Sequence, residues 1–147
     1  MKIQTQYHGE TVIDSTQILM FGNGLPGFPE QTQFILLPLP DNDVFFVLQS
    51  CNISSVAFIV TNPFQFFSDY DFKLDDSIVE KLDIQSEADV IVYTILTVQE
   101  PFSKSTANLQ APLIINRQTN KAKQVILNDT TYQTKHALFN EQASVKE

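Results

Sequence analysis

Side chains suited to catalysis or metal binding are scarce in this sequence of 147 residues. It contains two histidines, His8 and His136, and one cysteine, Cys51. Their spacing lacks the paired pattern of zinc sites. Cys51 with a histidine base would form a nucleophile, but no local signature of such an enzyme surrounds it, and a small buried cysteine is the commoner arrangement. We therefore expect no metal and no cofactor.

Two other patterns resemble catalytic motifs and have simpler explanations. Asp75 and Asp76 form a pair of carboxylates of the kind used for acid and base catalysis, yet they lie beside an expected helix start, where capping accounts for them. The glycine-rich segment 21–29 lacks the Gly-Lys-Ser/Thr ending of a phosphate-binding loop. The sequence therefore predicts a protein that is not an enzyme.

The segment 21–29, Phe-Gly-Asn-Gly-Leu-Pro-Gly-Phe-Pro, predicts a loop of defined shape. It holds three of the four glycines and two of the seven prolines. Glycine permits positive φ, and proline fixes φ at about −65°. Two interpretations stay open: a tight turn between two strands, or a loop that also contacts a partner. In the second case the candidate contacts are Phe21, Pro26 and Phe28.

Acidic residues outnumber basic ones by 17 to nine, which gives a formal charge of −8 and disfavours direct binding of nucleic acid. Eight of the acids lie between Asp69 and Asp89, whereas residues 117–135 are mainly basic. The protein is expected to have two electrically different sides. A basic partner would bind the acidic side, with Asp69, Asp71, Asp75 and Asp76 as candidate contacts. The alternative is a solvated acidic surface that maintains solubility.

The N-terminal residues, the apolar runs and the single cysteine indicate the cellular location that we expect for the protein. Residues 1–7 lack the apolar core of a signal peptide, and no run approaches the ~18 apolar residues of a membrane-spanning helix. A single cysteine cannot form an internal disulfide, which fits a reducing compartment. We expect a cytoplasmic protein without membrane contact.

Most of the chain has the pattern of short β-strands separated by turns. Residues 1–136 are expected to form one β-rich domain, and residues 137–147 a frayed tail. The run 90–98 is apolar on both alternating faces, so it should be a central strand covered on both sides. The expected strands are 3–7, 11–13, 34–37, 45–49, 56–61, 70–74, 90–98, 113–116 and 124–128.

One short helix is expected after the acidic pair. Ser77 and Glu80 have the spacing of a capping box, and Ile78, Val79 and Leu82 share one face. A second turn of helix is possible at Ser86, where a loop is the alternative.

Exposed aromatic residues are a second kind of candidate contact. Asn62-Pro63 favours a turn that ends the preceding strand, and Phe64 follows it directly. Phe64 belongs either to the core or to an aromatic anchor for a partner, and Phe102 in Glu100-Pro101-Phe102 presents the same choice.

Several blocks, in one order along the chain, resemble the FliW family of flagellar assembly factors. They cover nearly the whole chain except the tail. Two positions depart from the pattern of this family: Gly22-Asn23 stands where charged residues are expected, and a cysteine at position 51 is unusual. The blocks are residues 21–28, 46–50, 61–64, 70–76, 96–98 with 100–102, 106–112 and 124–128.

The resemblance implies a small antiparallel β-barrel-like protein without catalytic activity. It further implies that the protein binds cytoplasmic flagellin and, when free of flagellin, binds the RNA-binding regulator CsrA, so that the two partners exclude each other. CsrA bound in this way would no longer repress translation of flagellin mRNA. The alternative is an unrelated β-rich module for protein–protein interaction.

Overall fold

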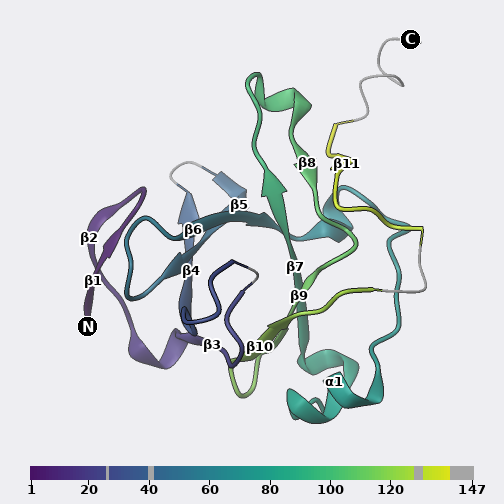
Figure 1. Ribbon diagram of the computed structural model, residues 1–147, viewed down its shortest axis with the longest axis horizontal. Helices are drawn as coiled ribbons and strands as arrows, with labels where there is room; N and C mark the ends of the chain where they lie inside the picture. Colours follow the sequence, from purple (N-terminus) through teal and green to yellow (C-terminus); the bar gives the residue numbers. More distant parts are fainter. Residues whose placement is uncertain (26, 40–41, 128–130, 140–147) are drawn as a thin grey trace.

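Seven strands form a closed barrel in the computed structural model, which describes residues 1–25, 27–39, 42–127 and 131–139 (Figure 1). Neighbouring strands pair antiparallel around the ring, except that β10 pairs parallel with β3 and closes it. In ring order the strands are β3 (Leu19–Phe21), β4 (Gln33–Leu39), β5 (Asn42–Ser50), β6 (Ala57–Thr61), β7 (Val90–Thr97), β9 (Leu113–Asn116) and β10 (Lys121–Gln124).

The remaining elements lie around this barrel. Strands β1 (Lys2–Thr5) and β2 (Gly9–Val12) form a hairpin, and β8 (Thr106–Ala107) joins β7 to β11 (His136–Ala137). The α-helix is α1 (Asp76–Lys81), at the lower right of Figure 1. Short 3-10 turns occupy Ser15–Gln17, Pro63–Gln65, Glu87–Asp89 and Phe102–Lys104. The expected mostly β, barrel-like fold with one short helix is confirmed.

The inside of the barrel is an apolar core to which all seven strands contribute. Phe21 of β3 and Phe34 of β4 are both fully buried and meet edge to face, with ring centroids 5.4 Å apart. Burial of such a side chain is worth about 1.5–3 kcal/mol, and the aromatic contact adds about 0.5–1.5 kcal/mol. Leu25 of the glycine-rich loop belongs to the same cluster, so the loop is anchored to the core.

The outer face of the barrel is also covered, which explains why its strands are apolar on both faces. The β1–β2 hairpin packs Ile3 against β4 and β5, and α1 packs Ile78 and Leu82 against β7 and β9. The expected central strand is confirmed: β7 pairs with β6, β8 and β9.

Two expected strands differ most from the structure, and the hairpin strands expected at 3–7 and 11–13 lie slightly earlier, at Lys2–Thr5 and Gly9–Val12. Residues 70–74 form no strand. They are an irregular segment in which Tyr70 is buried, so the apolar residues of this segment reflect a covered loop. The strand expected at 124–128 lies earlier, at Lys121–Gln124, although Val125 and Leu127 are buried beyond its end. Residues 128–130 lie outside the described part of the chain, as do Pro26 and residues 140–147 of the expected tail.

Helix α1 has the expected buried face but a different start. Asp75 occupies the N-cap position without a side-chain capping bond, and Ser77 is already inside the helix, so the capping box expected at Ser77 is wrong. The second turn of helix is confirmed at Glu87–Asp89, where the Asp89 carboxylate accepts a hydrogen bond from the Ser86 backbone N–H at 3.2 Å.

Candidate functional site

A groove with acidic residues at its edge lies between α1 and the segment that follows β6. We call it the acidic groove; its volume is about 700 Å³. Its floor is apolar, with Leu74, Val79 and Ile84 among its residues, and Asp71 and Glu87 are exposed along it. The lining is Phe64, Asp71, Phe72, Lys73, Leu74, Val79, Ile84, Glu87, Val90 and Val92.

The turn after β6 places Phe64 at this groove. The Asn62 side chain accepts a hydrogen bond from the Phe64 backbone N–H at 2.9 Å, and Pro63 supplies the fixed φ that suits a first helical position. Phe64 is 43% exposed and packs against Tyr70, with ring centroids 5.8 Å apart. The expected turn at Asn62-Pro63 is confirmed, and it leaves part of the Phe64 ring exposed at the groove.

Two tyrosines fix the chain on which Asp71 stands. The Tyr70 hydroxyl donates to the Leu109 carbonyl at 2.7 Å, and burial raises the pKa of this hydroxyl above its usual value, so it stays protonated. The Asp71 backbone N–H donates to the Tyr132 hydroxyl at 3.0 Å. The backbone at Asp71 is therefore fixed beside the groove, and its carboxylate is exposed there.

The structure brings some predicted contact residues together and separates others. Phe64 and Asp71 line the acidic groove, and the exposed Asp75 and Asp76 directly follow its Leu74. Asp69 lies in a separate hollow of about 340 Å³ that is lined by Tyr70 and His136 among others.

The other predicted contacts lie away from the acidic groove. Phe102 is 39% exposed and packs on Phe45 and Phe139. Phe28 is 38% exposed and meets Phe58 edge to face at 5.8 Å. Phe21 has no exposed surface, so it offers nothing to a partner in this structure; it is a core residue that anchors the loop.

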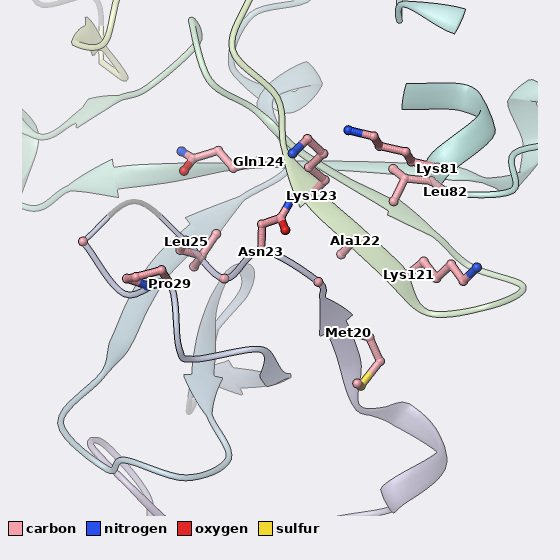
Figure 2. Close-up of a pocket in the computed structure, with 13 residues that line it drawn as sticks. Met20, Asn23, Leu25, Pro29, Lys81, Leu82, Lys121, Ala122, Lys123 and Gln124 are labelled. Atoms are coloured by element: carbon pink, nitrogen blue, oxygen red, sulfur yellow. The ribbon is translucent and has the colours of Figure 1, made fainter. Parts of the chain in front are cut away.

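The glycine-rich loop forms one wall of a second hollow, which sequence reasoning missed (Figure 2). We call it the lysine groove; its volume is about 590 Å³. Three lysines line it, Lys81 from α1 and Lys121 and Lys123 from β10. The basic run 117–135 pointed to Lys121 and Lys123. Lys81 could not be found in this way, because it lies within the acidic stretch 69–89. The other lining residues are Met20, Gly22, Asn23, Gly24, Leu25, Gly27, Pro29, Leu82, Ala122 and Gln124.

The residues with catalytic potential are separated from both grooves. His8 Nε2 lies 2.8 Å from the Pro38 carbonyl oxygen, and His136 Nε2 accepts from the Gln133 backbone N–H at 2.7 Å. Cys51 is buried, which raises the pKa of its thiol. Within the described residues, no three His, Cys, Asp or Glu side chains gather as a metal site requires. None of the helices described there is long and apolar enough to cross a membrane.

Comparison with known proteins decides the family. A family model described as "FliW protein" matches residues 2–138. The chain belongs to the FliW family. A FliW relative from Bacillus licheniformis, named flagellar assembly factor FliW, is 52% identical over 141 residues, covering 96% of this chain and 99% of the relative. A FliW relative of the same name from a Geobacillus species is 50% identical over 144 residues, covering 98% and 99%.

The fold of a solved FliW structure agrees with these sequence matches. The crystal structure of the flagellar assembly factor FliW superimposes with a TM-score of 0.92 at 47% identity, covering 97% of this chain and 99% of the other. The resemblance drawn from the sequence is thereby confirmed, and a role in flagellar assembly follows from the family. FliW membership also removes the alternative of an unrelated β-rich interaction module.

Proposed function

We propose that this protein is a non-enzymatic cytoplasmic binding protein with two mutually exclusive partners, flagellin and CsrA. Bound to flagellin, it leaves CsrA free to repress translation of flagellin mRNA. Free of flagellin, it binds CsrA and relieves the repression. The acidic groove is the observation that carries this proposal.

Charge complementarity supports CsrA as the partner of the acidic groove. A protein that binds RNA must present basic surface to the phosphates. The exposed carboxylates of Asp71, Asp75 and Asp76 stand at or beside one apolar groove, so their field would attract such a surface and raise the rate of encounter. The same field repels RNA, which keeps the protein from competing for the nucleic acid itself.

The apolar floor of the acidic groove would stabilise the complex once the partner has docked. Interface energy concentrates in a few aromatic and aliphatic residues shielded from water. Phe64 exposes 43% of its surface beside Leu74 and Val79, so a partner's apolar side chain has a place to bind. The Asp71 backbone is held by its hydrogen bond to Tyr132, so binding need not order the main chain at this point.

Neutralising the groove's carboxylates tests the proposal. The variant Asp71→Asn/Asp75→Ser/Asp76→Asn is expected to slow CsrA association about tenfold at low salt and to flatten its salt dependence, because steering depends on local charge. Stopped-flow fluorescence at several salt concentrations measures both quantities.

The matched control removes three carboxylates elsewhere. Glu10, Glu30 and Glu100 are exposed and outside the acidic groove, and their replacement by glutamine changes the net charge by the same amount. We expect this control to slow association less than threefold. Equal slowing by the two triple variants would assign the effect to total charge and return the acidic surface to a role in solubility.

A further inference from the structure

The lysine groove has the opposite electrical character to the acidic groove. Its lining contains three lysines and no carboxylate, in a chain of formal charge −8. Lys121 forms an ion pair with Asp83. In the described part of the chain, Lys81 and Lys123 have no such partner, so two cations face the groove uncompensated. Figure 2 shows the lysines on α1 and β10, with Asn23 and Leu25 of the glycine-rich loop beside them.

The lysine groove adjoins a smaller hollow that is lined partly by residues of the barrel core, and we call this hollow the barrel end. Leu25 and Gln124 line both the groove and this hollow of about 210 Å³, where Phe58, Ile95 and Ile126 add apolar surface. Ile126 is 61% exposed although it lies against this hollow. A ligand that spans the two hollows would therefore meet positive charge at one end and apolar surface at the other.

Gln124 carries an unused hydrogen-bond acceptor at the junction of the two hollows. Its Nε2 donates to the Ala111 carbonyl at 3.1 Å, whereas its Oε1 is buried and has no donor among the described residues. A buried acceptor without a donor destabilises the fold. A rotation of the Gln124 side chain would bring Oε1 to the hollow, where the backbone N–H of a bound peptide would supply the missing donor.

We propose that the lysine groove and the adjoining barrel end bind an acidic peptide segment of a protein partner. Carboxylates of the segment pair with Lys81 and Lys123, an apolar side chain packs on Leu25 and Ile126, and a backbone N–H donates to Gln124 Oε1. A nucleic acid fits less well, because the net charge of −8 repels a phosphate backbone and the barrel end offers apolar surface. This inference rests on the proposed function, because it assigns the lysine groove to flagellin.

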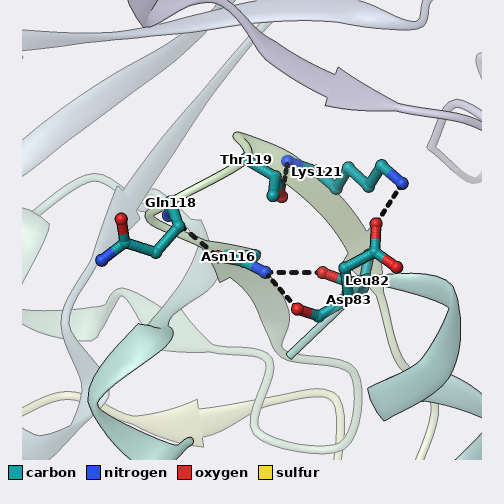
Figure 3. Close-up of polar contacts among 6 residues, drawn as sticks. All are labelled: Leu82, Asp83, Asn116, Gln118, Thr119 and Lys121. Atoms are coloured by element: carbon teal, nitrogen blue, oxygen red, sulfur yellow. Dashed lines mark hydrogen bonds and ion pairs between the residues drawn. The ribbon is translucent and has the colours of Figure 1, made fainter. Parts of the chain in front are cut away.

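Helix α1 links this groove to the acidic one. Val79 lines the acidic groove, and Lys81 and Leu82 line the lysine groove. Figure 3 shows how the end of α1 is tied down: Asn116 Nδ2 donates to the Leu82 carbonyl at 2.6 Å and to the Asp83 carbonyl at 3.1 Å. A ligand that shifts α1 in one groove changes the shape of the other, which provides a physical route to mutual exclusion.

Two probes and a pair of variants test the groove. The probes are a fluorescein-labelled synthetic peptide of alternating glutamate and leucine, measured by anisotropy, and purified flagellin, measured by calorimetry. The variant Lys81→Gln/Lys123→Gln is expected to bind both about tenfold more weakly, because it removes two charge pairs with the ligand. The control Lys104→Gln/Lys135→Gln removes two exposed lysines outside the groove and should stay within twofold.

The outcomes separate this inference from the proposed function. Peptide binding that depends on Lys81 and Lys123, without any binding of flagellin, would support the groove and contradict the proposed function. Flagellin binding at equal affinity to wild type and both variants would uphold the proposed function and contradict a binding role for the lysine groove. A single-stranded RNA oligomer that binds more tightly than the peptide, and depends on the same lysines, would assign the groove to phosphates and also overturn the inference.

Discussion

Replacing Gly24 with alanine is expected to destabilise the fold by about 3 kcal/mol. Gly24 has φ +66°, where an L-residue costs about 1–2 kcal/mol. A Cβ at this position would also lie 2.6 Å from the Pro29 carbonyl oxygen and contact the Phe28 carbonyl oxygen, and overpacking of this kind costs about 1–3 kcal/mol. These backbone atoms cannot retreat freely, because Leu25 and Phe28 exchange two backbone hydrogen bonds, of 3.2 and 2.7 Å.

The neighbouring glycines provide graded controls in urea unfolding. Gly27 has φ +85° but open space around its Cβ position, so alanine there should cost only the strain of about 1–2 kcal/mol. Gly22 has open space and no positive φ, and alanine there should lie within about 0.5 kcal/mol of wild type. Equal effects at the three positions would show that the loop is not held in the shape described.

Asn116→Ala is expected to cost about 3 kcal/mol and to weaken binding at both grooves. Asn116 is 1% exposed, and its side chain satisfies the buried Leu82 carbonyl, the Asp83 carbonyl and the Gln118 backbone N–H. Each group left without a partner costs about 1–3 kcal/mol, less where water reaches it. The loss also frees the end of α1, to which Val79 and Lys81 of the two grooves are attached.

Unfolding and binding are measured on the same Asn116→Ala protein. Urea unfolding gives the loss of stability, with the exposed Gln118→Ala as a control expected within about 0.5 kcal/mol of wild type. Calorimetry below the unfolding range gives the affinities for CsrA and for flagellin. Stability lost without any change in either affinity would contradict a coupling role for α1.

The barrel strands with strong local patterns were predictable, and the short ones were not. The strand at Leu113–Asn116 has its expected bounds because the β-branched pair Ile114-Ile115 stands between Pro112 and the turn that begins at Arg117. Strands β3, β8 and β11 have two or three residues each, too few for any periodicity, and depend on neighbours distant in sequence. The aromatic segment 70–74 matched a strand pattern because a covered loop needs apolar residues as much as a strand does.

The candidate site was only partly predictable for a similar reason. Phe64 and Asp71 were both predicted as contacts, but as separate ones, and the fold brings them to one groove. The lysine groove unites Lys81 with Lys123 and the glycine-rich loop, and this requires the parallel pairing of β10 with β3, which no local pattern signals. Phe21 and Phe28 flank the same loop, yet only the fold decides that Phe21 is buried and Phe28 half-exposed.

The most direct test of the proposed function is a calorimetric titration of CsrA into the purified protein, repeated after saturation with flagellin. The proposal predicts stoichiometric binding of CsrA to the free protein and loss of that binding once flagellin is bound. Undiminished CsrA binding to the flagellin complex, or no binding of CsrA to the free protein, would contradict it.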